Sequence, residues 1–137
     1  MNLFVDSSAF YAAADAGDEH HARARAALGG GDRLLTSDHV FAESWSLLER
    51  RLGWDAAERF WGAIRGGVAA VEYVGPEDLE VAWSIGEAFP DQGFSLTDRT
   101  SFALMLRTGV HRAASFDKDF AVFRFGARRE RAFEIVR

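Results

Sequence analysis

Leu3-Phe4-Val5-Asp6-Ser7-Ser8-Ala9-Phe10 is the stretch that decides the fold. Its three leading apolar residues do not alternate with polar ones, which predicts a short strand buried on both faces. One carboxylate and two hydroxyls follow, and the chain turns helical from Phe10 to Ala14. Because open α/β sheets bind ligands beyond the carboxyl ends of their strands, we expect Asp6 to lie at a ligand site.

Strands and helices alternate along the rest of the chain. Hydrophobic periodicity predicts helices over 19–28, 38–52, 55–64, 76–89 and 97–109, and strands over 33–35, 68–74, 112–116 and 132–136. The last strand alternates apolar and polar residues, as an edge strand does. The pattern predicts an α/β fold with a mainly parallel sheet that is covered on both sides. Without a repeat or a linker, residues 1–137 are expected to form one domain.

The composition restricts the partners and the compartment of the protein. A formal net charge of −5 at pH 7 argues against holding nucleic acid through an overall positive field. A nucleic-acid substrate would therefore need local basic patches and a bound cation. The absence of cysteine excludes disulfides and thiolate metal sites. The chain also lacks a signal sequence and any run of about 18 apolar residues, so we expect a cytoplasmic protein with no membrane partner.

Two of the predicted helices carry an acid at the edge of their apolar face. Asp98 shares a face of the helix over 97–109 with Phe102 and Met105. Glu43 lies beside the main apolar row of the helix over 38–52, which is formed by Phe41, Trp45, Leu48 and Leu52. The helix over 76–89 has its own apolar row, formed by Leu79, Ala82, Gly86 and Phe89.

Four acids are placed so that they can converge. Asp6 and Asp117 each follow a parallel strand, so both leave the sheet at the same edge, where Glu43 and Asp98 can join them. Two carboxylates ~4 Å apart repel by about 1 kcal/mol in water and by about 4 kcal/mol at an effective dielectric of about 20. A divalent cation would offset this repulsion, and oxygen-only ligands favour Mg²⁺ or Mn²⁺. Such a site supports metal-assisted phosphodiester hydrolysis.

Each acid also has a purely structural explanation. Asp6 could cap the helix that follows it, and Asp98 fits a capping box that begins at Ser95. Glu43 could be a solvated residue beside an apolar stripe. Asp117 and Asp119 could be ordinary turn formers. The functional prediction therefore depends on all of the acids occurring together.

The same residues resemble a known family, the PIN domains. Val5-Asp6-Ser7-Ser8-Ala9-Phe10 resembles the opening motif of these domains, and three further stretches resemble their later acidic motifs. These stretches are Phe41-Ala42-Glu43-Ser44, Ser95-Leu96-Thr97-Asp98 and Ser115-Phe116-Asp117-Lys118-Asp119-Phe120. The resemblance covers essentially the whole chain, and the length is similar to that of VapC-like toxins of bacterial toxin–antitoxin pairs. It implies a three-layer α/β/α sandwich, Mg²⁺-dependent cleavage of RNA, homodimers and inhibition by a cognate antitoxin.

The resemblance also implies roles for individual residues. Asp6, Glu43, Asp98 and Asp117 match the catalytic acids, and all but Glu43 would bind Mg²⁺, with Mn²⁺ as a substitute. Ser8 and Asp119 match auxiliary positions. Some members carry a further acid where this chain has Thr100 and Ser101, so the number of metal ions stays open. Apart from the resemblance, five basic residues could hold RNA phosphates or could equally be solvated surface residues: Arg99, Lys118, Arg124, Arg128 and Arg129.

Two other functions remain open from the residues alone. The first is an acid-cluster phosphohydrolase that forms an aspartyl-phosphate, although Ser8 stands where that chemistry typically has a second Asp. The second is a non-catalytic binding module in which the acids only cap helices. Adjacent His20 and His21 do not share a helix face and are expected to be solvated. Part of the aromatic set Trp45, Trp54, Phe60 and Trp61 is expected to contact a second subunit or an antitoxin helix.

Overall fold

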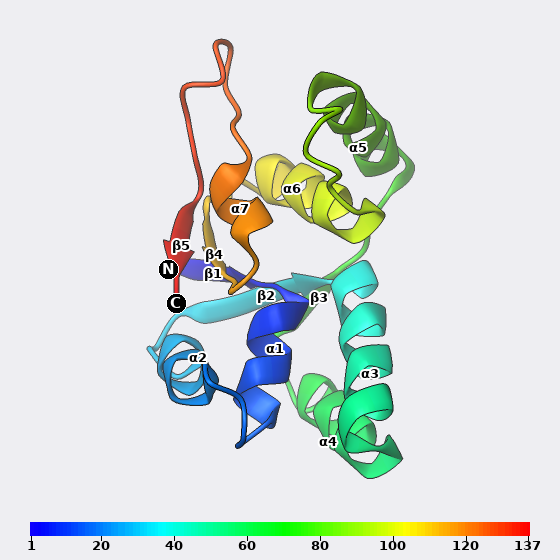
Figure 1. The fold of residues 1–137 in the computed structure, drawn as a ribbon, viewed down its shortest axis with the longest axis vertical. Coiled ribbons are helices and arrows are strands. Elements are labelled where there is room, and N and C mark those ends of the chain that lie inside the picture. The colour runs from blue at the N-terminus through cyan, green and yellow to red at the C-terminus, as the bar shows by residue number, and fades with distance from the viewer.

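A central sheet of five parallel strands organises the computed structural model, which describes residues 1–137 (Figure 1). The strands are β1 (Asn2–Val5), β2 (Arg33–Ser37), β3 (Ala70–Glu72), β4 (Arg112–Ala114) and β5 (Glu134–Val136). Their order across the sheet is β3-β2-β1-β4-β5, and every neighbouring pair is parallel. The apolar stretch at Leu3–Val5 therefore forms the middle strand and is fully buried, as predicted from its lack of alternation.

Seven helices cover the sheet. They are α1 (Ser7–Ala14), α2 (His21–Leu28), α3 (Asp38–Leu52), α4 (Trp54–Arg65), α5 (Pro76–Ala88), α6 (Leu96–Thr108) and α7 (Lys118–Val122). Figure 1 shows α1 to α4 on one side of the strands and α5 to α7 on the other. This arrangement confirms the predicted three-layer α/β/α sandwich. No helix combines the length and the apolarity that crossing a membrane requires.

Several element boundaries differ from the prediction. β3 covers only part of the expected strand over 68–74, because as an edge strand it pairs with β2 alone, from Ala70 to Glu72. β4 ends at Ala114, and shortly beyond it the backbone N–H groups of Phe116 and Asp117 donate to serine hydroxyls. The short helix α7 was not predicted. The prediction that the last strand lies at the edge of the sheet is confirmed for β5.

Phenylalanine side chains fill the core between the sheet and α6. The rings of Phe102 and Phe123 stack with centroids 4.4 Å apart, and Phe120 packs edge-on against Phe102 at 5.0 Å. Phe4 of β1 lies against Phe120 at 6.3 Å. Each such ring removes a large apolar surface from water, so this cluster fixes α6 and α7 on the sheet.

The predicted apolar rows of two helices are only partly confirmed, by the burial of Leu48 and Ala82. On α3 the buried residues are Val40, Ser44 and Leu48, whereas Leu52 is exposed. On α5 the buried residues are Asp78, Ala82 and Ile85, and Leu79 is 45% exposed. The predicted row of α5 did not include Asp78, which is buried. Asp78 is buried because it has a charged partner on α6.

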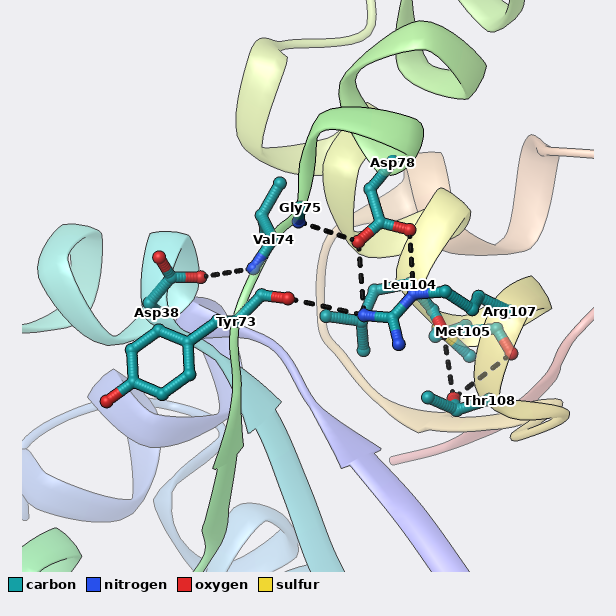
Figure 2. Close-up of polar contacts among 9 residues, drawn as sticks. All are labelled: Asp38, Tyr73, Val74, Gly75, Asp78, Leu104, Met105, Arg107 and Thr108. Atoms are coloured by element: carbon teal, nitrogen blue, oxygen red, sulfur yellow. Dashed lines mark hydrogen bonds and ion pairs between the residues drawn. The ribbon is translucent and has the colours of Figure 1, made fainter.

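That partner is Arg107, which joins α6 to α5 (Figure 2). Its Nε and Nη2 donate to the two carboxylate oxygens of Asp78 at 2.9 and 3.1 Å, and Nη2 also donates to the carbonyl of Tyr73 at 3.2 Å. The backbone N–H of Gly75 donates to the same carboxylate at 2.9 Å. Burial alone would raise the pKa of Asp78, but these hydrogen bonds outweigh it and hold the pKa below its ordinary value.

Asp38 at the start of α3 completes this network from the other side of the β3–α5 connection. Its Oδ1 accepts a hydrogen bond from the backbone N–H of Val74 at 2.8 Å, as Figure 2 shows. Ser37 caps the same helix by accepting from the backbone N–H of Val40 at 3.0 Å. The start of α3 and the pair α5–α6 are thus held at one edge of the sheet, which positions Glu43 and Asp98.

Candidate active site

A cleft of about 510 Å³ opens at the carboxyl ends of β1 and β4. Its lining contains only two groups that can carry positive charge, Arg51 and His20. Six acids line it: Asp6, Asp18, Glu43, Asp98, Asp117 and Asp119. The four acids predicted to converge are therefore in one cleft. The strong imbalance of charge indicates a site that binds cations.

Asp6 is only 3% exposed and occupies the position before the first residue of α1. Its side chain makes no capping bond to that helix, so the capping explanation is wrong. Instead, Oδ2 accepts hydrogen bonds from the hydroxyls of Ser8 at 2.9 Å and Ser115 at 3.0 Å. Burial raises the pKa of Asp6 above its ordinary value despite these bonds, and the charge of Asp117 adds to the rise.

The two serines connect Asp6 to the end of β4. The hydroxyl of Ser8 accepts from the backbone N–H of Phe116 at 2.9 Å, and that of Ser115 accepts from the backbone N–H of Asp117 at 3.1 Å. Each hydroxyl therefore links the Asp6 carboxylate at the end of β1 to the backbone that follows β4. Ser115 was not predicted as a site residue, although its place two residues before Asp117 is visible in the sequence.

Asp98 both caps α6 and lies in the cleft, as the two explanations of this residue predicted. Its backbone N–H donates to the Ser95 hydroxyl at 3.0 Å and its carboxylate accepts from the Ser95 N–H at 3.3 Å, which completes the capping box of α6. The residue is 8% exposed and faces the cleft. Burial, followed by the charges of Asp117 and Asp6, raises the pKa of Asp98 to about 7. Capping and membership of the acid cluster are thus compatible.

The tightest group of acids comprises Asp98, Asp117 and Asp119. One carboxylate oxygen from each lies within 4.8 Å of the others. Asp117 also caps α7, because its Oδ1 accepts from the backbone N–H of Asp119 at 2.9 Å. The sequence favoured Asp117 over Asp119, but the geometry brings both to the cluster. The exposed Lys118 lies 3.5 Å from Oδ1 of Asp119.

Glu43 reaches the cleft from the second turn of α3. Its Oε1 accepts a hydrogen bond from the hydroxyl of Ser7 at 2.5 Å, so the side chain turns toward the start of α1. Arg51 lies two turns further along the same face, with Leu47 between them, and all three residues line the cleft. The guanidinium carbon of Arg51 stands 5.0 Å from the ring centre of Tyr11. Arg51 was missed, although its spacing from Glu43 could have indicated it.

Arg99 lies elsewhere, between α5 and α6. Its Nη1 donates to the carbonyl of Ala82 at 3.3 Å, and a Cβ at Gly86 would collide with the guanidinium. This arginine is therefore a packing residue of the helix pair and does not line the cleft. Arg124 is likewise engaged, because its Nη1 donates to three carbonyls at the end of α7. Lys118 lies beside Asp119 of the acid cluster, whereas Arg128 and Arg129 do not line the cleft, and their contact with RNA stays a prediction.

The donor set fits a divalent cation with a preference for oxygen. The Asp98, Asp117 and Asp119 carboxylates converge, and their one ion pair is that of Asp119 with the exposed Lys118. The raised pKa of Asp98 means that the cluster does not hold all its charges at neutral pH without help. Carboxylate oxygens without cysteine favour Mg²⁺ or Mn²⁺ over softer metals.

Comparisons with known proteins agree with this architecture. The family model described as PIN domain matches residues 3–126. Over 124 residues the chain is 36% identical to the 23S rRNA-specific endonuclease VapC20 of two Mycobacterium tuberculosis strains, covering 90% of this chain and 95% of that protein. The VapC20 crystal structure, described as a sarcin–ricin loop cleaving toxin, superposes with a TM-score of 0.83 at 35% identity, over 88% of this chain and 93% of that one.

A more distant structure shows how far the fold extends. VapBC2 from Rickettsia felis, bound to a DNA fragment from its promoter, matches with a TM-score of 0.66 at 8% identity, over 88% of this chain and 91% of that chain. At this identity the likeness concerns the fold alone. The family match and the VapC20 identity go further, because both span most of the chain, and the family match contains all four predicted acids. The chain belongs to the PIN-domain family and is a VapC-like member of it.

Proposed function

We propose that this chain cleaves ribosomal RNA with the help of a divalent cation, and that it is the toxin of a type II toxin–antitoxin pair. The observation that carries the proposal is the group of carboxylates from Asp98, Asp117 and Asp119, with the buried Asp6 in the same cleft. These groups gather at the sheet edge where parallel strands end, which is where α/β folds bind ligands.

The proposed ligands of the cation are Asp98, Asp117 and Asp119, with Asp6 completing the set. Mg²⁺ is the proposed ion and Mn²⁺ its substitute, since both prefer oxygen ligands. A bound ion of this kind lowers the pKa of a coordinated water and stabilises charge on phosphoryl oxygens.

The remaining cleft residues position the acids. The hydroxyls of Ser8 and Ser115 hold one oxygen of Asp6 and leave Oδ1 with only a long contact of 3.5 Å, to the Ser7 hydroxyl. Glu43 is held by Ser7. Hydrogen bonds of this kind orient a carboxylate, and their loss at a metal site typically lowers metal affinity or activity by about 10- to 100-fold.

The proposed substrate is a ribosomal RNA loop. VapC20 is named as specific for 23S rRNA and as cleaving the sarcin–ricin loop, and it matches this chain at 36% identity. The cleft itself repels phosphates before a cation is bound, so Arg51 and the exposed Lys118 are proposed to hold the RNA backbone at its rim.

A cognate antitoxin and a second copy of the chain are the proposed protein partners. Helix α4 leaves Trp54 and Trp61 largely exposed, and large exposed aromatic side chains are characteristic of interfaces. Co-expression with the neighbouring small gene product should give a stable complex, and sedimentation of the purified chain should give a dimer. A monomer at high concentration would contradict the dimer.

The test of the proposed function is cleavage of a synthetic sarcin–ricin hairpin. The native protein should cut it in Mg²⁺ or Mn²⁺ and stop in excess chelator. Asp98→Asn should lower the cleavage rate by more than about 100-fold. Mutating a group that merely supports a metal ligand typically lowers activity by about 10- to 100-fold, and this variant changes a proposed ligand itself. Asp91→Asn, an exposed acid outside the cleft, is the matched control and should cut normally. Cleavage that persists in chelator would refute the metal-dependent mechanism.

A further inference from the structure

The adjacent histidines at the start of α2 have different environments. His21 Nδ1 contacts the carbonyl of Ala12 at 2.8 Å and so ties α2 to α1. His20 turns toward the cleft and lies flat on the ring of Phe116, with centroids 4.5 Å apart and planes inclined by 5°. His20 and Phe116 both line the cleft. The stacked pair of His20 and Phe116 is called the aromatic platform below.

Both ring nitrogens of His20 are already engaged. Nδ1 lies 2.9 Å from Nη2 of Arg23, and because arginine is only a donor, Nδ1 must accept there. Nε2 then carries the hydrogen and contacts the Glu19 carboxylate at 3.2 Å. This arrangement disfavours a role for His20 as a metal ligand or a general base. Its side chain is nevertheless 30% exposed and lines the cleft.

The platform adjoins the acid cluster. Phe116 directly precedes Asp117, and its backbone N–H is fixed by the hydroxyl of Ser8 at 2.9 Å. The guanidinium carbon of Arg23 lies 5.9 Å from the centre of the Phe116 ring, which adds positive charge at the side of the platform. A flat apolar surface and a cation therefore occur together next to carboxylates that would hold a metal ion.

We propose that the aromatic platform is a nucleobase-binding subsite, on which an unpaired base next to the cleaved phosphodiester stacks. The inference rests on the proposed ribonuclease function. Proteins that read RNA loops splay out bases and stack them on aromatic side chains, histidine included. Arg23 would contact the phosphate of the stacked nucleotide. The subsite would thus select RNA whose loop can release a base at that position.

The test uses a sarcin–ricin hairpin with the fluorescent base 2-aminopurine at one unpaired position at a time. Binding is measured to protein carrying Asp98→Asn, so that the RNA stays intact. At one position the fluorescence should be quenched on binding. Adding His20→Ala should abolish the quenching and weaken binding by about 5- to 150-fold, the range for the loss of one base–aromatic stack. His20→Phe should preserve both signals, because it keeps a ring without the nitrogens.

Two further variants separate stacking from a loss of structure. Phe116→Leu removes the ring beneath His20 and should weaken binding of the same RNA. His111→Ala is the matched control, because His111 also contacts an aromatic ring, that of Phe125 at 5.0 Å, but does not line the cleft. Circular dichroism checks the fold of each variant.

The outcomes distinguish the subsite from the proposed function. Wild-type affinity and quenching in His20→Ala, or an equal loss in His20→Phe, would overturn the subsite even if the native chain cleaves RNA. Conversely, quenching that depends on His20 would support the subsite even if the native chain cleaves none of the hairpins. In that case only the cleavage proposal fails.

Discussion

Replacing Asp98 with Asn removes one negative charge from the acid cluster and keeps a similar shape. The asparagine oxygen can still accept from the backbone N–H of Ser95, so the capping box of α6 survives. The variant therefore isolates the cost of the charge. We expect it to stabilise the metal-free protein at pH 8 and to remove most of the stabilisation that Mg²⁺ gives to the native chain.

The magnitude follows from the pKa. The pKa of Asp98 is raised from 3.8 to about 7, first by burial and then by Asp117 and Asp6. Since one pKa unit corresponds to ~1.36 kcal/mol, the ionised carboxyl destabilises the fold at pH 8 by up to about 4 kcal/mol. The folded chain binds the proton more tightly than the unfolded chain. The contribution of Asp98 to the stability of the metal-free protein therefore falls as the pH rises from about 4 to about 7.

The assay is urea unfolding of metal-free protein at pH 5 and pH 8, with and without Mg²⁺. The free energy of unfolding of Asp98→Asn should exceed that of the native chain by about 1 to 4 kcal/mol at pH 8, and by less at pH 5. Mg²⁺ should stabilise the native chain and Asp91→Asn alike, because it binds the folded state. A less stable Asp98→Asn at pH 8, with an undiminished response to Mg²⁺, would refute the reasoning.

Other variants test the supports of the site. Arg107→Met should lower the free energy of unfolding at pH 7 by about 1 to 3 kcal/mol, because it leaves the buried Asp78 unpaired, although Arg107 is 43% exposed and solvent screens the pair. The loss should shrink as the pH falls through the lowered pKa of Asp78, which acid unfolding would show. Ser115→Ala should reduce RNA cleavage by about 10- to 100-fold, because Asp6 loses a donor; unchanged kinetics would contradict this. Arg51→Ala should raise KM and reduce the salt dependence of RNA binding by about one phosphate contact, whereas an unaltered salt slope would exclude that role.

The middle of the fold could be predicted because its signals are local. Leu3–Val5 is buried on both faces, so its apolar run is unbroken, and Asp6 directly follows it. The same logic located Asp117 after β4. Helical periodicity brought Glu43 and Asp98 to the correct faces, because each shares a turn with core residues.

The remaining features depend on contacts between distant segments. Helix α7 has five residues, which is too short for a period to be visible, and so the convergence of Asp119 was not favoured. The burial of Asp78 was not predicted, because its partner Arg107 lies 29 positions away. Arg99 could not be told from a phosphate ligand until its packing against Gly86 was seen. His20 reaches Phe116 only through the tertiary fold.

Titration of the metal-free protein with Mn²⁺ tests the central claim most directly, because it needs no RNA and no partner. Calorimetry should show saturable binding to the native chain and to Asp91→Asn. Binding to Asp117→Asn should be weaker by more than about 10-fold, because a member of the tightest acid group has lost its charge. Equal Mn²⁺ affinity in all three proteins would contradict a cation site built from these carboxylates.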